Sequence, residues 1–373
     1  MKKNILTIFG LMLISVAAWG IGVDNSGHGV KALGMNKAFT AVADDPSAIY
    51  WNPAGLAFLD DGAELHVYGL FSFRECKYTV NGAEEKYSNL NIIPGNFFSY
   101  KRKNLALGLG FNVPYGGGGA EYENFLGSGY DLKGASGFFA VTPTFAFKLS
   151  PRLAVGAGFS LLYGGMERLT SGIETKLSGV AGYGWNVGLL YKASEKFNIG
   201  FSVRSKISVK VDGNTTMNGN ELDAEAEWNL PYYFTLGFAY KLNPHWTLAF
   251  DLNYTLWSQM DKIKFTVAGN ATENETYYDN SYYACIGAEY KKERFALRTG
   301  LRYEHSPTKD EGMNPLSCDV DLLVGSVGGA YRLGKKVGLS VAALYIYGFD
   351  REYNAQTFHQ SFIVLMTGID LKF

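Results

Sequence analysis

The chain has 373 residues, and its 34 basic and 35 acidic side chains leave a net charge of −1, so its composition gives no sign of a nucleic-acid-binding protein. Aromatic residues make up 15% of the chain and glycine occupies 45 positions, against 10 prolines. Apart from one stretch near the N-terminus, the sequence has no long apolar run of the kind that a helical membrane protein needs.

The first twenty residues have the arrangement of a secretory signal peptide. Residues 1–3 carry two lysines, residues 5–16 are apolar, and residues 17–20 (AAWG) offer small side chains for cleavage. The alternative is a single anchoring helix, but the apolar stretch is short for a membrane span. We therefore expect residues 1–20 to be removed, with cleavage after Gly20 or after Ala18.

Residues 21–60 lack the alternation of a strand and contain two helix-start signals. Asp45 precedes Pro46 and Asn52 precedes Pro53, so each pair supplies a capping side chain and a first helical residue. The segment also contains apolar side chains that need burial, namely Ile49, Tyr50, Trp51, Leu56, Phe58 and Leu59. It is either an N-terminal linker or, as we expect, a compact helical plug.

From about residue 62 onward, apolar and polar residues alternate with a period of two. In residues 246–257, for example, the even positions are Trp, Leu, Phe, Leu, Tyr and Leu, whereas polar residues dominate the odd positions. This period places the two sets on opposite faces of a strand. A soluble sandwich shows the same period, so alternation alone does not decide the fold.

The connections between the strands favour a membrane barrel. An aromatic residue precedes a short basic turn at Tyr100, Phe147, Tyr191, Tyr240, Tyr290 and Tyr331, and the series ends at Phe373. Longer polar connections alternate with these turns at residues 75–85, 116–134, 165–179, 212–227, 269–278, 304–318 and 348–358. Short periplasmic turns, long external loops and interface aromatics are typical of outer-membrane barrels. Seven aromatic strand ends, each with a partner strand, predict about 14 strands of about 10 residues, with a bulge in the poorly alternating stretch 319–331.

Several motifs together resemble a known family. Near the N-terminus they are Gly27-His28-Gly29, residues 41–48 (AVADDPSA) and residues 52–56 (NPAGL), and along the strands they include Arg298-Thr299-Gly300. They resemble the FadL/TodX family of outer-membrane transporters for long-chain fatty acids and aromatic hydrocarbons. The specific part is the N-terminal hatch motif, which comprises Asp44, Asp45, Pro46, Asn52, Pro53, Ala54 and Gly55.

The resemblance implies a transmembrane antiparallel β-barrel at residues 61–373, with a small helical hatch at residues 21–60 inside its lumen. It also implies capture of ligand among the external loops, a pocket inside, and sideways exit through a kink in the third strand. That strand lies at about residues 104–115 here, and its candidate opening comprises Gly108, Gly110, Asn112, Pro114 and Gly116. Gly and Pro weaken strand pairing. The alternative is that these glycines only make room for the hatch.

Charged residues at inward-facing positions are candidates for ligand or hatch contacts. They are Arg204, Lys206, Asp251, Arg298, Arg302 and Glu304. Because a guanidinium can bind a carboxylate through two hydrogen bonds, Arg204, Arg298 and Arg302 are candidates for binding a fatty acid. The alternative, which we favour for Arg298 and Arg302, is that they pair with Asp44 and Asp45 and hold the hatch.

A glycine-rich external loop at residues 116–130 carries Tyr122, Phe125 and Leu126. Exposed apolar side chains on such a loop suit the capture of a hydrophobic ligand. They could equally pack on neighbouring loops.

Catalytic and metal-binding patterns are absent from the sequence. Cys76, Cys285 and Cys318 lie far apart without CxxC spacing, so they indicate neither a disulfide framework nor a zinc site, and we expect them to be incidental small residues. The five histidines are scattered, and no GxSxG or HExxH motif occurs. We expect no enzymatic activity, no metal and no cofactor, haem included.

The sequence therefore predicts an all-β monomer in the outer membrane of a Gram-negative bacterium. Its expected partners are outer-membrane lipid, a small hydrophobic ligand that it takes up passively, and the barrel-assembly machinery. Two other functions stay open: a water-filled general porin, which should lack a folded hatch, and a surface barrel with a structural or adhesive role.

Overall fold

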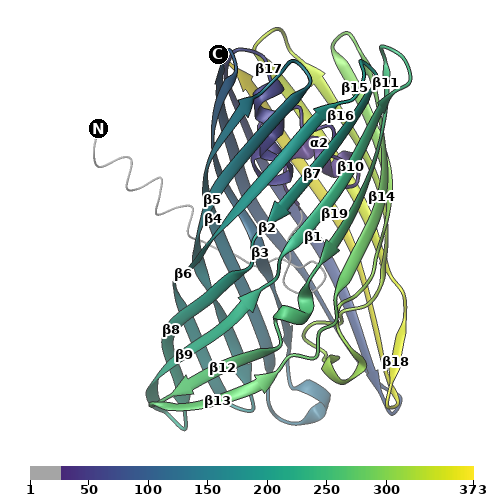
Figure 1. Ribbon diagram of the computed structural model, residues 1–373. Coiled ribbons are helices and arrows are strands. Elements are labelled where there is room, and N and C mark those ends of the chain that lie inside the picture. The colour runs from purple at the N-terminus through teal and green to yellow at the C-terminus, as the bar shows by residue number, and fades with distance from the viewer. Residues whose placement is uncertain (1–26) are drawn as a thin grey trace.

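The computed structural model describes residues 27–373, which form one closed antiparallel β-barrel (Figure 1). The expected signal peptide and residues 21–26 lie outside the described residues. Strand β1 closes the sheet by pairing with β19 from Glu64 opposite Lys372 to Val80 opposite Gln356. The sheet contains nineteen segments, and five strands consist of two segments each, so the described chain has fourteen strands, as predicted.

Nine strands are continuous: β1 (Gly62–Val80), β2 (Ala83–Arg102), β3 (Leu105–Tyr122), β4 (Leu132–Lys148), β5 (Leu153–Thr170), β6 (Ile173–Lys192), β15 (Phe295–Glu304), β16 (Leu322–Arg332) and β19 (Gln356–Lys372). The interrupted strands are β7 (Phe197–Arg204) with β8 (Ile207–Met217), β9 (Asn220–Leu230) with β10 (Tyr233–Lys241), β11 (Trp246–Thr255) with β12 (Lys262–Val267), β13 (Asn270–Glu275) with β14 (Ser281–Lys292), and β17 (Val337–Gly348) with β18 (Arg351–Tyr353). The break between β9 and β10 includes Pro231, which has no N–H to donate to a ladder. Short 3-10 helices occupy two loops, at η2 (Phe125–Gly127) and η4 (Asp310–Gly312), and a third, η3 (Trp257–Gln259), lies in the break between β11 and β12.

Many strands are longer than the predicted ten residues. β2 and β6 each have 20 residues, and several stretches expected to be long polar loops continue as paired strands. Five of these hairpins close with two residues of positive φ at positions 81–82, 171–172, 218–219, 268–269 and 354–355, as tight hairpin turns require. The prediction failed because polar alternation continues above the membrane, where backbone pairing still holds two strands together.

The bulge predicted at residues 319–331 is not found. Residues 319–321 belong to the preceding loop, and β16 pairs with β15 and β17 without a register shift. Register shifts occur instead between β3 and β4 and between β5 and β6. Poor alternation in this stretch therefore marked the end of a loop and not an irregular strand.

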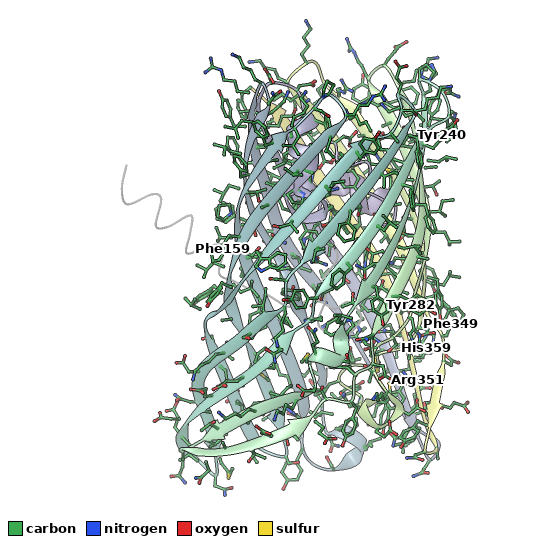
Figure 2. The ribbon with its side chains drawn as sticks, viewed as in Figure 1. Phe159, Tyr240, Tyr282, Phe349, Arg351 and His359 are labelled. Carbon is green, nitrogen blue, oxygen red and sulfur yellow. A yellow bond between two sulfur atoms is a disulfide. The ribbon has the colours of Figure 1, made fainter. Side chains whose placement is uncertain are left out.

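The outer surface of the barrel presents large apolar side chains. Leu107, Phe145, Leu297 and Ile363 are among many that are about half exposed, and Phe159 and Tyr240 project from the wall in Figure 2. These side chains alternate with buried neighbours along each strand, which is the pattern of a wall that faces lipid outside. No helix in the described part of the chain has the length and hydrophobicity needed to cross a membrane.

Residues 27–59, here called the luminal segment, lie inside the barrel near the end that holds the short turns and the C-terminus (Figure 1). The segment contains α2 (Val30–Gly34), α3 (Ala48–Trp51) and the 3-10 helix η1 (Pro53–Phe58). Wall glycines allow its close packing: a Cβ on Gly188 would lie 2.1 Å from Asn52 Oδ1, and one on Gly156 would lie 2.4 Å from the carbonyl carbon of Pro53. The interior core thus consists of the luminal segment and the inward side chains of the wall.

Candidate functional site

The two expected capping positions shape the luminal segment. Asn52 Oδ1 accepts a hydrogen bond from Ala54 N at 3.2 Å, and Pro53 is the first residue of η1, as the sequence indicated. The Asp45 carboxylate instead accepts hydrogen bonds from Ser47 N and Ser47 Oγ, and α3 begins at Ala48 rather than at Pro46. The motif therefore builds two tight turns that fold the segment back on itself.

Buried polar contacts fasten the backbone of the luminal segment to the wall. The Asp251 carboxylate of β11 accepts hydrogen bonds from Phe39 N at 3.1 Å and Thr40 N at 2.8 Å. Asn186 Nδ2 of β6 donates to the carbonyl of Ile49 at 2.7 Å. Because an unpaired buried backbone group lowers the stability of the fold, these contacts favour a single position of the luminal segment inside the barrel.

Two buried ionic triads also join the luminal segment to the wall. Lys31 lies 2.8 Å from Glu289, which pairs with Arg298 at 2.7 Å. Lys37 lies 3.3 Å from Glu304, which pairs with Arg302 at 2.9 Å. In each triad the wall supplies a carboxylate and an arginine, and the luminal segment supplies a lysine.

The prediction that Arg298 and Arg302 pair with Asp44 and Asp45 is wrong, because both arginines have other carboxylate partners. Glu289 is the direct cross-strand neighbour of Arg298, so the wall satisfies this arginine before the luminal segment reaches it. Asp44 pairs with Lys31 at 2.9 Å, and Arg302 additionally donates to Asn36 Oδ1 at 3.0 Å. The sequence analysis did not identify Lys31, Lys37 and Glu289 as contact residues. The one available signal was that two lysines occur in a segment whose apolar side chains need burial.

The lysine of the first triad gives a testable pH dependence. Burial alone would lower the pKa of Lys31, but Asp44 and Glu289 together raise it above its ordinary value. A raised folded-state pKa means that the contribution of Lys31 is complete below about pH 10.4, the ordinary lysine pKa, and is lost as pH rises through the higher value.

We therefore expect bilayer conductance of the wild type to stay low from pH 6 to 10 and to rise only above that range. Lys31→Met should remove this alkaline step, whereas Lys291→Met, an exposed lysine at the turn end, should retain it. A conductance step of equal size in Lys31→Met would show that another group controls it.

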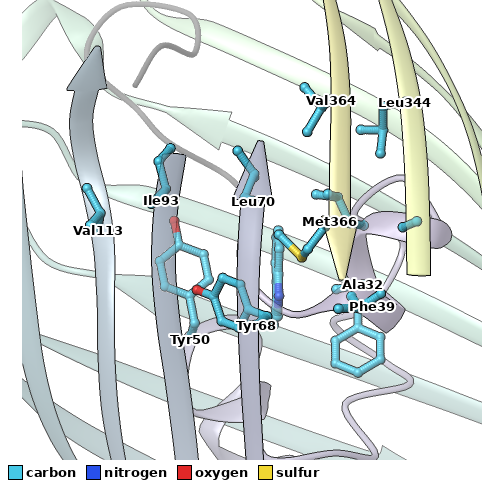
Figure 3. Close-up of a cluster of buried hydrophobic side chains, with 14 of the residues drawn as sticks. Ala32, Phe39, Tyr50, Tyr68, Leu70, Ile93, Val113, Leu344, Val364 and Met366 are labelled. Atoms are coloured by element: carbon cyan, nitrogen blue, oxygen red, sulfur yellow. The ribbon is translucent and has the colours of Figure 1, made fainter. Parts of the chain in front are cut away.

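Beyond the luminal segment lies a set of apolar side chains that we call the apolar chamber: Leu70, Ile93, Val113, Leu344 and Val364. All are buried, and they lie on five neighbouring strands of one stretch of the wall, β17, β19, β1, β2 and β3. Figure 3 shows these strands side by side, with Tyr50 and Tyr68 below the five side chains. Arg204 of β7 is the nearby cation, and its guanidinium lies 4.3 Å from the ring centre of Tyr50 and 4.0 Å from that of Tyr233. It lines a cavity together with the predicted opening residues Asn112 and Pro114.

Beside this chamber the ladder between β2 and β3 is interrupted. The two strands pair only from Arg102 opposite Leu105 to Asn96 opposite Phe111, although both continue for more than ten residues toward the loops. The β3–β4 register shifts between Asn112 and Tyr115 and again between Gly116 and Gly118, and Gly116 has a φ of 64°. Ile93 and Val113 of the apolar chamber stand on the two edges of this gap.

The two explanations offered for the glycines of the third strand, a lateral opening and room for the luminal segment, therefore apply at different positions. A Cβ on Gly108 or Gly110 would approach Ile49 to 2.8 or 3.0 Å, so these two glycines make room for the luminal segment. Pro114 and Gly116 lie at the register shifts, where the strand leaves its neighbour. The candidate opening is thus concentrated at residues 112–116.

The predicted capture residues pack mainly on neighbouring loops. Tyr122 is buried, and its hydroxyl donates to the carbonyl of Pro315 at 2.8 Å. Phe125 stacks on Tyr78, and of the three residues only Leu126 is exposed, with an exposed fraction of 39%.

The expectation that the cysteines are incidental is wrong for two of them. Cys76 of β1 and Cys318 of the loop between β15 and β16 form a disulfide, whereas Cys285 is a buried free thiol. Their separation of 242 residues hid the pair, which becomes adjacent only when the barrel closes.

The comparisons with known proteins agree with this geometry. Residues 11–368 match the family described as outer membrane protein transport protein (OMPP1/FadL/TodX). The long-chain fatty acid transport protein of Escherichia coli O6:H1 is 23% identical over 93% of this chain and 91% of its own length, and outer membrane protein P1 of Haemophilus influenzae is 22% identical over 86% and 84%.

Solved structures share the fold. A Pseudomonas aeruginosa FadL homologue matches with a TM-score of 0.83 at 16% identity, over 94% of this chain and 100% of that one. The Pseudomonas putida toluene transporter TodX matches with a TM-score of 0.79 at 19% identity, over 95% and 100%.

Proposed function

Since this chain belongs to the OMPP1/FadL/TodX family of outer-membrane transport proteins, we propose that it takes up small hydrophobic molecules and releases them sideways into the membrane through the gap between β2 and β3. The substrate class comes from the relatives, which are named for long-chain fatty acids and toluene. The observation that carries the lateral route is the interrupted β2–β3 ladder beside the apolar chamber.

In this proposal the luminal segment, with residue 60, acts as the hatch of a barrel that begins at residue 61. A hatch fixed by Asp251, Asn186 and two ionic triads blocks straight passage toward the periplasm. A hydrophobic molecule in the apolar chamber then has the gap in the wall as its nearest apolar exit. A hatch fixed in this way argues against a general porin, because a porin needs a water-filled channel.

The candidate residues divide into separate roles. Arg298 and Arg302 anchor the hatch, because each already has a carboxylate partner. Arg204, which faces the cavity with Asn112 and Pro114, is the candidate partner for a fatty-acid carboxylate. Leu126 is the candidate first contact for ligand outside, and no catalytic role is proposed for any residue.

Tying the two edges of the gap together tests the lateral route. Asn89 of β2 and Gly119 of β3 face each other across it, with Asn89 Nδ2 donating to the Gly119 carbonyl at 2.5 Å. We expect oxidised Asn89→Cys/Gly119→Cys protein to lose uptake of a radiolabelled long-chain fatty acid in proportion to the cross-linked fraction, and to regain it on reduction.

The matched control places a cross-link where the ladder is complete. Thr175 of β6 and Thr215 of β8 are direct partners, with their hydroxyls 2.9 Å apart. Oxidised Thr175→Cys/Thr215→Cys protein should transport like the wild type. Because the reductant also opens the Cys76–Cys318 disulfide, wild-type protein treated with reductant serves as a second control. Full uptake by protein cross-linked across the gap would refute lateral release.

A further inference from the structure

The near-zero net charge of this chain conceals a strong separation of charge between the two ends of the barrel. The six turns between strands at the short-turn end contain fourteen basic and two acidic residues, at positions 101–104, 148–153, 192–197, 241–246, 291–295 and 332–337, and the connection from the luminal segment to β1 adds Asp60 and Asp61. The connections at the opposite end contain ten basic and twenty-three acidic residues, at positions 75–86, 121–133, 167–176, 210–227, 261–279, 306–321 and 349–359. In an outer-membrane barrel the short turns are periplasmic, so the cationic end faces the periplasm.

The densest part of this end, here called the cationic patch, consists of residues 291–294 and 332–336. It contains six cations, Lys291, Lys292, Arg294, Arg332, Lys335 and Lys336, against the single carboxylate of Glu293. The two turns are joined directly, since Arg332 N donates to the carbonyl of Arg294 at 2.8 Å. They border a cleft of about 360 Å³ between the wall and the luminal segment.

The patch differs from the lysines at the opposite end in how its charges are compensated. There, Lys176, Lys210 and Lys262 each lie within 2.6 Å of a carboxylate. All six patch cations are exposed, and none takes part in a salt bridge within residues 27–373. Asp44, Asp60 and Asp370 also line the cleft, but each pairs with a residue outside the patch. A concentration of cations without salt-bridge partners raises the local potential and attracts an anionic partner.

The position of the patch identifies that partner. Phe295 and Tyr331 are direct neighbours across β15 and β16, 40% and 48% exposed, at the base of the two turns. Exposed aromatic rings at the ends of barrel strands mark the membrane–water interface. The cations directly beyond them therefore stand at the depth of lipid phosphates, which lysine and arginine bind through charge-assisted hydrogen bonds.

We propose that the cationic patch binds the phosphodiester headgroups of anionic phospholipids in the periplasmic leaflet. A headgroup with net negative charge fits six cations, whereas a zwitterionic headgroup brings an ammonium that the patch repels. The inference depends on the orientation of the barrel in the membrane and is independent of which molecule it transports.

The test compares lipid retention by matched charge variants of the full chain. Wild-type protein, Arg332→Gln/Lys335→Gln/Lys336→Gln and the opposite-end control Lys176→Gln/Lys210→Gln/Lys262→Gln are each placed in vesicles of equal parts phosphatidylglycerol and phosphatidylcholine. After extraction in mild detergent, native mass spectrometry counts the lipids that remain bound. Heat modifiability on gels confirms that each barrel is folded.

We expect wild type and control to retain phosphatidylglycerol in preference to phosphatidylcholine, and the patch variant to lose about tenfold or more of this preference, because each cation near an anionic surface adds to the attraction. Equal retention by wild type and patch variant would overturn the proposal, as would an equal loss in the control. Displacement of the lipid by millimolar glycerol phosphate would also overturn it, since the patch would then be a site for soluble phosphate.

Discussion

Replacing Glu289 with alanine is expected to convert a barrel of low conductance into one that passes ions. Glu289 is the shared carboxylate of the first triad, and the exposed fractions of its side chain and that of Arg298 are both 8%. Its removal leaves Arg298 and Lys31 as two buried cations, with only the half-exposed Asp44 as their partner. Breaking a buried ion pair from one side costs about 3–5 kcal/mol.

This cost falls on the contact between the hatch and the wall, so it shifts the hatch toward a displaced state. Because each 1.4 kcal/mol is a factor of ten in a population, the displaced fraction should rise by roughly 100-fold or more. The barrel itself should stay folded, since the ladders on both sides of β14 are unchanged.

Planar-bilayer recordings test this prediction. We expect no openings of general-porin size in the wild type, frequent openings in Glu289→Ala, and an intermediate frequency in Glu289→Gln, which keeps hydrogen bonding but loses the charge. Glu293→Ala, four residues further along the chain and exposed, should behave like the wild type. Identical recordings from Glu289→Ala and Glu293→Ala would show that the triad does not hold the hatch, and porin-sized openings in the wild type would contradict the hatch itself.

Opening the Cys76–Cys318 disulfide is expected to release the loop at residues 305–321 from the mouth of the barrel. Both cysteines are fully buried, and Arg74 Nη2 donates to the neighbouring Ser317 carbonyl at 2.6 Å. A native disulfide typically contributes about 2–4 kcal/mol. We expect Cys76→Ser/Cys318→Ser protein to unfold at a lower temperature and to be cut by trypsin at Lys309.

Limited proteolysis with and without reductant provides the readout. Without reductant the wild type should resist cleavage in this loop, and with reductant it should behave like the double variant. Cys285→Ser removes a buried free thiol from the wall and serves as the control, with the resistance of the wild type. Cleavage of the non-reduced wild type at the rate of the double variant would contradict the tethering role.

The architecture was readable from the sequence because the membrane imposes it. A strand with lipid on one side and a packed lumen on the other must alternate, and the interface favours an aromatic residue at each end. These constraints are local, so Tyr100 and the six later aromatic ends were sufficient to count fourteen strands. The turn-forming chemistry of Asn52 and Pro53 is local as well, and it indicated the helical hatch.

Expectations that depended on partners across the lumen were less accurate. Arg298 was recognised as an inward-facing arginine, but its pairing with Glu289 depends on the register of β14 and β15, which no spacing along the chain reveals. The role of each glycine in β3 likewise depends on where the hatch lies: Gly108 faces Ile49, whereas Gly116 lies at the break in the ladder.

By itself, then, the sequence determined the barrel, its strand count and the presence of a folded helical segment before the first strand, because periodicity and turn residues act over a few positions. Only the tertiary structure decided the two ionic triads, the Cys76–Cys318 disulfide, the extent of the β2–β3 gap and the junction of two basic turns into one patch. Each of these joins residues that are far apart in the chain, and closure of the barrel is the step that brings them together.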